Sequence, residues 1–317
     1  MELVGIAEVW AAVERVRGWA VRTPLVPCPW ARGRLWVKPE GLQPVGAFKV
    51  RGVANALACR EVARRGVGVV THSSGNHGRA LAYVARGLGV ECVVVVPRGA
   101  PEVKVAAVRG LGARVVVVDA GRREEVAWEV AAAEGKVLVP PFDDRDVIAG
   151  QGTVGVEVVA DLAEVETVLV PVGGGGLASG VATAVKALRP GVRVVGVEPE
   201  LAGDAAESVR EGRLVVWPVE ERSRTVADGV RVGLSELTFA HVWERLDGVV
   251  TVSEEEILAA MGALVCEGRM VAEPSGAVAV AAQLAGKAPG GSTVAVVSGG
   301  NADRGVLARV VGEYGRG

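Results

Sequence analysis

Short apolar runs alternate with longer amphipathic stretches along most of the chain. The apolar runs are rich in valine and show no polar alternation, which is typical of strands buried on both faces of a parallel sheet. Between them lie Ala-, Glu- and Arg-rich stretches of helical length. The pattern therefore predicts an α/β fold whose parallel sheets are covered by helices. Strands are expected at 67–71, 91–97, 114–119, 136–139, 165–172, 192–197 and 293–298, and helices at 78–88, 103–111, 123–134, 177–188 and 254–267.

The number of strands and the length of 317 residues fit two sheets better than one. No repeat period or linker separates two halves, so we expect the second domain to be inserted into the first. The pair Pro140-Pro141 is the clearest break within the chain. We predict two open parallel-sheet domains with helices on both faces: a large domain of residues 1–66 and 146–317, and a small domain of residues 67–145.

Composition and charge exclude several classes of protein. Lys and Arg (35) nearly balance Asp and Glu (37), and a net charge of −2 leaves no electrostatic footprint for nucleic acid or an anionic membrane. No apolar stretch reaches membrane-spanning length without charges or a dense run of glycine. The N-terminal segment carries acids where a signal peptide carries Lys or Arg, and four scattered cysteines fit a reducing compartment. We therefore expect a cytoplasmic protein with no nucleic-acid or membrane partner.

A glycine-rich loop follows one predicted strand. Ligands of open parallel sheets bind at the carboxyl ends of strands, beside helix N-termini. Four consecutive glycines let backbone N–H groups turn toward an anion, and the dipole of the following helix adds attraction. The loop lacks the Lys-Ser/Thr ending of a P-loop, which argues against hydrolysis of nucleoside triphosphates. The sequence therefore predicts a phosphate site at Gly173, Gly174, Gly175 and Gly176, with a tight turn as the alternative.

A dinucleotide site is a second interpretation of the same loop. Gly173, Gly175 and Ala178 fit the pattern G-x-G-x-x-A, and Glu198 follows about 20 residues later at a strand end. A nicotinamide-dependent oxidoreductase therefore stays open as an alternative from another class of enzyme. Against it, the unit lies in the middle of the chain and has no partner half.

Two further motifs carry candidate chemistry. The segment 73–77, Ser-Ser-Gly-Asn-His, offers hydroxyls and N–H groups at a helix N-terminus, which suit a carboxylate. The alternative is an N-cap, which needs only one such residue. Lys49 follows Phe48 and precedes an apolar helical stretch, a setting that desolvates an amine and lowers its pKa, as a Schiff-base lysine requires. A solvated surface lysine is the alternative.

The motifs taken together are recognisable. The chain resembles the fold-type II pyridoxal 5'-phosphate (PLP) enzymes, in particular serine racemases and serine/threonine dehydratases such as threonine ammonia-lyase. The matching segments follow one another in the order of that family over nearly the whole chain, which makes the resemblance highly specific. They are residues 47–52, 71–78, 97–104, 141–143, 148–153, 171–179, 196–199, 227–229, 273–277 and 298–301.

The resemblance implies roles for individual residues around PLP. It makes Lys49 the lysine that forms the Schiff base, with Phe48 packed against the cofactor ring. Asn76 would bond the phenolic oxygen of the ring, and the glycine loop would hold the phosphate in the large domain. Ser298 would meet the pyridine nitrogen, where a neutral hydroxyl does not hold a proton on the ring as an Asp would. This weaker electron sink favours elimination.

The substrate side is implied in the same way. Ser73, Ser74, Gly75, Asn76 and His77 would receive the substrate carboxylate. Racemisation needs acid/base groups on both faces of the planar carbanion, and the resemblance places Ser74 on the face opposite Lys49. We therefore predict that Lys49 and Ser74 are the catalytic residues.

A divalent cation and a homodimer are also implied by the resemblance. Glu198, the carbonyl of Ala202 and Asp204 match the metal site of the family. Oxygen-only ligands suit Mg²⁺, Mn²⁺ or Ca²⁺. Without the resemblance, the spacing of Glu198 and Asp204 favours the alternative, in which they are two solvated acids on a loop after a strand.

We predict a PLP-dependent ammonia-lyase that converts L-threonine to 2-oxobutanoate, and L-serine to pyruvate, with release of ammonia. Serine racemase activity is expected beside it. A dedicated serine racemase and a dehydratase of a related hydroxy amino acid, such as hydroxyaspartate, are alternatives within the family. A non-enzymatic binding module gives no role to Lys49.

Overall fold

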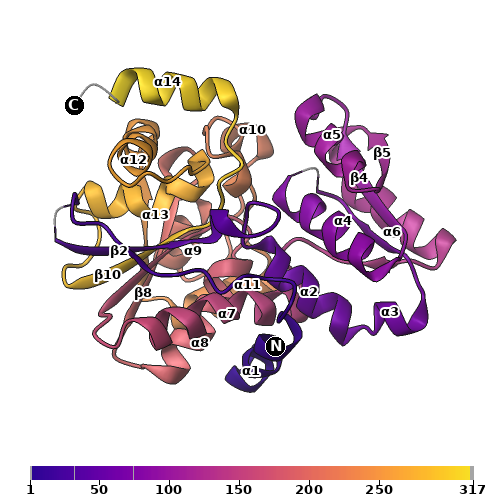
Figure 1. The fold of residues 1–317 in the computed structure, drawn as a ribbon, viewed down its shortest axis with the longest axis horizontal. Coiled ribbons are helices and arrows are strands. Elements are labelled where there is room, and N and C mark those ends of the chain that lie inside the picture. Colours follow the sequence, from indigo (N-terminus) through magenta and orange to yellow (C-terminus); the bar gives the residue numbers. More distant parts are fainter. Residues whose placement is uncertain (1, 32, 74, 315–317) are drawn as a thin grey trace.

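The computed structural model describes residues 2–31, 33–73 and 75–314, which form two sheets lying side by side in Figure 1. The larger sheet joins the two ends of the chain, because an N-terminal strand pairs in parallel with the last strand. All its neighbouring strands are parallel except the first two, which are antiparallel. In spatial order its strands are β1 (Val26–Pro27), β2 (Arg34–Pro39), β10 (Ser292–Val297), β7 (Thr167–Pro171), β8 (Arg193–Pro199) and β9 (Gly248–Val252).

The smaller sheet is built from one continuous part of the chain and lies on the right of Figure 1. Its neighbouring strands are all parallel. In spatial order they are β5 (Arg114–Val118), β4 (Cys92–Pro97), β3 (Val69–Thr71) and β6 (Val137–Leu138).

Helices cover both faces of the larger sheet. Side chains that alternate along the strands, such as Val168 and Leu169, pack into two different apolar cores. One core contains α7 (Arg145–Asp161), α8 (Gly176–Leu188) and α11 (Glu236–Arg245), and the other contains α12 (Glu254–Cys266), α13 (Pro274–Leu284) and α14 (Arg304–Tyr314).

The smaller sheet is covered in the same way. One face packs on α2 (Lys49–Cys59), α4 (Asn76–Leu88) and α5 (Glu102–Gly110). The other face packs on α6 (Arg123–Glu134). The remaining elements are the helices α1 (Ile6–Arg15), α3 (Val62–Arg65), α9 (Asp204–Glu211) and α10 (Val219–Arg222), and the 3₁₀ turns η1 (Glu40–Leu42), η2 (Ala120–Arg122), η3 (Glu200–Ala202) and η4 (Asp228–Val230).

The structure confirms the predicted α/β class with two parallel sheets and helices on both faces. Each predicted strand and helix is present, with its ends shifted by two residues at most. Strands β1, β2 and β9 were not predicted from the sequence. Strand β2 carries the charged residues Arg34 and Lys38, so it lacks the continuous apolar run that marks the buried strands.

The two sheets divide the chain as follows. All strands of the smaller sheet lie between residues 67 and 145, and all strands of the larger sheet lie outside that range. Helix α2 belongs by sequence to the predicted large domain, yet its apolar side chains pack with the core of the smaller sheet. The domain limits therefore stay a prediction. Among the described residues, no helix is both long and apolar enough to cross a membrane.

Candidate active site

Three of the predicted site segments follow the carboxyl ends of strands, in both sheets. Gly173–Gly176 follows β7, Ser298 follows its neighbour β10, and Ser73 follows β3 of the smaller sheet. Carboxyl ends of neighbouring parallel strands lie along one edge of a sheet, where ligands bind in this class of fold. The site therefore draws on both sheets.

Lys49 is the first residue of α2, and its side chain is largely enclosed by protein. Its Nζ donates a hydrogen bond to the carbonyl oxygen of Pro141 at 2.7 Å and lies 4.9 Å from the centre of the Phe48 ring. Burial of the amine lowers the pKa of Lys49 to about 8. An amine that is partly neutral near neutral pH is what a nucleophilic or proton-abstracting lysine needs.

The glycine loop is packed so closely that side chains have no room. A Cβ on Gly174 would overlap the ring of Phe142, and one on Gly173 would lie 2.8 Å from the Cα of Val230. Gly175 has a φ of +82°, in the left-handed region that favours glycine. Phe142 follows Pro141, so one dipeptide contacts both the Lys49 amine and the glycine loop.

The same loop presents unpaired donors. Within the part of the chain that the structure describes, no acceptor takes the N–H groups of Gly173, Gly174, Gly175 or Gly176. They lie at the N-terminus of α8, where the helix dipole adds positive potential. This donor set fits a phosphate group.

Asn76 begins α4 and connects to two other segments. Its Nδ2 donates to Oε1 of Glu273 at 2.6 Å, and its Oδ1 accepts from Nδ2 of Asn301 at 2.7 Å. Burial, with a smaller contribution from the charge of Asp228, raises the pKa of Glu273 to about 7. One hydrogen of the Asn76 amide is left for a further acceptor. Glu273 has no role predicted from the sequence, because a single acid before a proline carries no spacing signal.

Ser298 lies beside the lysine segment. Its carbonyl accepts a hydrogen bond from the backbone N–H of Phe48 at 3.1 Å, and the next residue, Gly299, pairs with Ala47. Among the described residues, the Ser298 hydroxyl forms one long hydrogen bond, 3.4 Å, to the carbonyl of Ser275. The structure thus brings Phe48, Lys49 and Ser298 together, and places Asn76 next to Gly299.

The carboxylate segment is only partly visible. Ser74 lies outside the described residues, so its predicted role has no structural test. Gly78 allows the turn, because a Cβ there would overlap the carbonyl oxygen of Ser73. The His77 ring is buried, contacts the Val139 carbonyl through Nε2 at 2.9 Å, and is kept neutral because burial lowers its pKa to about 3. The imidazole therefore packs into the protein interior. A bound anion would meet the backbone N–H of His77 and not its ring.

The predicted metal ligands surround the start of α9. Glu198 is buried near the end of β8 and accepts hydrogen bonds from the N–H groups of Ala205, at 3.3 Å, and Ala206, at 2.8 Å. Asp204 lies 3.9 Å from the guanidinium of Arg222. Burial raises the pKa of both carboxyls. Among the described residues no group of three or more His, Cys, Asp or Glu side chains is placed to hold a metal ion.

Comparison with known proteins identifies the family. Over residues 16–300 the sequence matches the family described as pyridoxal-phosphate dependent enzyme. The chain belongs to this family. It is 39% identical to serine racemase of Arabidopsis thaliana over 315 residues, which cover 95% of this chain and 94% of that protein. It is 37% identical to the catabolic L-threonine dehydratase TdcB of Escherichia coli (strain K12), covering 98% of this chain and 96% of that protein.

A solved structure agrees with the sequence relatives. The crystal structure of a threonine deaminase from T.th. is similar with a TM-score of 0.86 and 42% sequence identity, covering 94% of this chain and 99% of that chain. Family membership decides between the two interpretations of the glycine loop in favour of PLP. In agreement with this, the Glu198 carboxylate faces the N–H groups of α9, where the dinucleotide alternative required it to bind a ribose.

The residues present fit PLP. The cofactor carries a phosphate, an aldehyde carbon, a phenolic oxygen and a ring nitrogen. The site offers unpaired N–H groups at a helix N-terminus, a desolvated amine on Lys49, a free amide hydrogen on Asn76 and a weakly bonded hydroxyl on Ser298.

Proposed function

We propose that this PLP-dependent enzyme is an ammonia-lyase that acts on L-threonine and L-serine, with serine racemase activity beside it. The observation that carries the proposal is the desolvated amine of Lys49, joined through the Pro141-Phe142 dipeptide to a glycine loop with unpaired N–H groups. The similarity to a serine racemase and to threonine dehydratases over most of the chain supports the substrate class.

The cofactor-binding roles follow the chemistry of each residue. Gly173–Gly176 would hold the phosphate of PLP through backbone N–H groups. Phe48 would pack against the ring, Asn76 would donate to the phenolic oxygen, and Ser298 would contact the ring nitrogen. Bound PLP withdraws electrons from the Cα of an amino acid attached to its aldehyde carbon.

Lys49 would move the proton of the reaction. After the substrate amine displaces it, its neutral Nζ would take the proton from Cα, and the β-hydroxyl would leave as water by taking up a proton that the resulting Nζ ammonium returns. The released enamine takes up water and yields a 2-oxo acid and ammonia. A pKa of about 8 keeps part of the Lys49 amine neutral at neutral pH, as the proton transfer requires.

The substrate carboxylate would bind at the N-terminus of α4. Ser73, Gly75, Asn76 and His77 supply backbone N–H groups there, and the buried His77 ring fixes the turn. Ser74 would give and take a proton on the face of the carbanion opposite Lys49, which is the step that racemisation adds.

We also propose a divalent cation, Mg²⁺, Mn²⁺ or Ca²⁺, bound by Glu198, Asp204 and the carbonyl of Ala202. Burial and, to a smaller degree, the charge of Asp204 raise the pKa of Glu198, so a positive ion between the two carboxyls would relieve both effects. The carboxyls and the carbonyl form a set of hard oxygen ligands. The homodimer and the cytoplasmic location predicted from the sequence remain part of the proposal. Sedimentation of the purified protein tests the dimer.

One experiment tests the function. PLP-loaded protein is incubated separately with L-serine, D-serine and L-threonine, and the 2-oxo acid and both enantiomers are measured. We expect 2-oxobutanoate from L-threonine and pyruvate from L-serine, with some D-serine. D-serine without any 2-oxo acid would support the dedicated racemase suggested by the Arabidopsis relative. Absence of all three products would contradict the proposal.

A further inference from the structure

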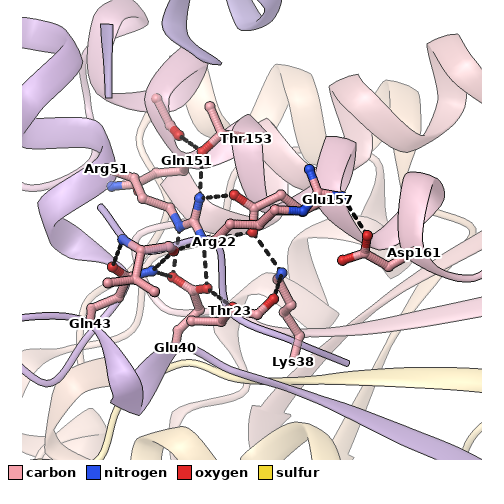
Figure 2. Close-up of polar contacts among 12 residues, drawn as sticks. Arg22, Thr23, Lys38, Glu40, Gln43, Arg51, Gln151, Thr153, Glu157 and Asp161 are labelled. Atoms are coloured by element: carbon pink, nitrogen blue, oxygen red, sulfur yellow. Dashed lines mark hydrogen bonds and ion pairs between the residues drawn. The ribbon is translucent and has the colours of Figure 1, made fainter. Parts of the chain in front are cut away.

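A fully buried arginine lies two residues after Lys49. Arg51 is in the first turn of α2, and its guanidinium is bound on two sides, as Figure 2 shows. On one side Nε and Nη2 donate to the two carboxylate oxygens of Glu40 at 2.7 and 2.8 Å. On the other side Nη1 and Nη2 donate to the two oxygens of Glu157 at 2.7 and 2.8 Å.

A second cation completes the group. Nζ of Lys38 lies 2.6 Å from the Glu157 carboxylate and donates to the carbonyl of Thr23. Glu157 is 12% exposed, and the other three side chains are completely buried. We call Arg51, Glu40, Glu157 and Lys38 the buried quartet. Its two positive and two negative charges cancel, so no charge in it lacks a partner.

Stability alone does not explain the buried quartet. Removing four charged groups from water costs a large desolvation free energy, and apolar side chains of similar volume commonly stabilise a core as well or better. What an arginine bound to two carboxylates adds is direction, because its planar guanidinium donates paired hydrogen bonds to each carboxylate in one geometry only. The buried quartet therefore fixes how its elements are oriented.

The elements that it joins lead to the active site. Glu40 directly follows β2, Arg51 lies in α2 and Glu157 lies in α7. Helix α7 touches α2 through backbone, since a Cβ on Gly150 would lie 2.6 Å from the carbonyl oxygen of Arg51 and from the Cα of Gly52. These glycines allow the backbones of α2 and α7 to touch where the helices cross, beside the Gln151 side chain, whose Oε1 accepts a hydrogen bond from the Gly52 N–H at 3.1 Å.

The other side of α7 contacts the helix of the glycine loop. A Cβ on Gly152 would lie 2.9 Å from the carbonyl oxygen of Gly180, and a Cβ on Gly155 would lie 2.8 Å from that of Val181. Both belong to α8, which begins at Gly176. The stack α2–α7–α8 thus sets the distance between Lys49 and the glycine loop.

We propose that the buried quartet positions Lys49: Arg51, held between Glu40 and Glu157, fixes the first turn of α2 on α7 and so keeps the amine in place relative to the glycine loop. The inference rests on the proposed function, which makes Lys49 the cofactor lysine. Arg51 and its partners are positioning residues, since they act through the helix that carries Lys49.

Arg51→Lys tests the inference, because it keeps the buried positive charge but removes the planar guanidinium that bonds both carboxylates. We expect kcat for L-threonine to fall by about 10- to 100-fold, as a displacement of about 1 Å produces. The KM should change little, because the carboxylate segment lies on α4, outside the quartet. A second readout uses cofactor-free protein: the pH dependence of Lys49 acetylation by acetic anhydride, followed by peptide mass spectrometry. Its midpoint should rise by at least one pH unit as the amine loses its buried position.

Two further variants make the test decisive. Lys38→Met/Glu157→Gln removes one charge of each sign, so the group stays neutral while Arg51 loses one of its carboxylates. It should shift both readouts in the same direction, and it carries the test if Arg51→Lys does not fold. The control is Leu264→Ala, which creates a cavity at a buried position of α12, in the core that α12 shares with α13 and α14. It should lower the melting temperature without changing kcat or the acetylation midpoint at a temperature where it is folded.

The inference is overturned if folded Arg51→Lys and the double variant keep the wild-type kcat and acetylation midpoint, or change them no more than Leu264→Ala does. Failure of the proposed function has a different signature. The unmodified protein would then give no 2-oxo acid and no visible absorbance band with PLP, whereas the acetylation midpoint of Lys49 is measured without the cofactor.

Discussion

The Lys49 amine and the Pro141 carbonyl, 92 residues apart in sequence, form a hydrogen bond of 2.7 Å. Pro141 lies in the segment that leaves the smaller sheet after β6 and enters α7. Phe142, the next residue, packs against the glycine loop at the end of β7. This short segment therefore connects Lys49 to the predicted phosphate site. A substitution that displaces either the lysine or the glycine loop should also shift the other.

The first prediction concerns the amine itself. Lys49→Ala should lower turnover of L-threonine by roughly a thousandfold or more, because it removes both the attachment point of the cofactor and the proton acceptor. The visible absorbance band of PLP-loaded protein should be lost as well. Lys186→Ala is the matched control, since Lys186 pairs with Asp247 on the surface. Near-normal turnover in Lys49→Ala would show that another lysine holds the cofactor.

The glycine loop gives a second prediction. In Gly174→Ala the new Cβ overlaps the Phe142 ring, and relief of that overlap should move the loop and weaken PLP binding by roughly tenfold or more. Gly191→Ala is the control, because no atom of the described part of the chain lies within 4 Å of a Cβ at that position. Titration of cofactor-free protein with PLP, followed by absorbance, measures both. Equal affinities in the two variants would argue against the loop as the phosphate site.

Some of this site could be predicted from sequence and some could not. The glycine loop, Lys49 and the segment 73–77 are each local: several informative residues stand together after a recognisable apolar run. Glu273, Glu40 and Glu157 are single acids, which in a sequence look like solvated surface residues. Only folding brings Glu273 to Asn76 across 197 residues, and Glu157 to Arg51 across 106. The signal that marks them is burial, which no spacing pattern encodes.

The buried His77 ring predicts how stability depends on pH. Its pKa is about 3 in the folded protein against 6.5 for an exposed histidine, so between these values the unfolded chain binds more protons. Stability from this group is complete above pH 6.5 and is lost as the pH falls toward 3. His77→Gln should remove this pH dependence. When the pH is lowered from 7 to 4.5, the free energy of unfolding of the variant should fall by about 2–3 kcal/mol less than that of the wild type. Urea unfolding at the two pH values measures it, and identical losses would contradict the assignment.

The cation proposal makes a prediction that separates it from a solvated loop. If Glu198 and Asp204 hold a divalent ion, a chelator should lower the melting temperature, and added Mg²⁺ or Mn²⁺ should restore it. Glu198→Ala should melt at a lower temperature and no longer respond to the chelator. If neither chelator nor metal changes the melting temperature of the wild type, the cation proposal is wrong. Glu198 then serves only to accept hydrogen bonds from the N–H groups at the start of α9.

The last prediction separates racemisation from elimination through Ser74. A single base returns a proton to the side from which it came, so forming D-serine needs a second group on the face opposite Lys49. Ser74→Ala should therefore abolish D-serine formation and D-serine elimination, while L-threonine and L-serine are still dehydrated at a reduced rate. If Ser74 only caps α4 and contacts the carboxylate, all these rates should fall together. The ratio of D-serine to L-threonine turnover in this one variant decides between the two, because a change in carboxylate binding affects both substrates, whereas the loss of the proton-transferring group opposite Lys49 affects only D-serine.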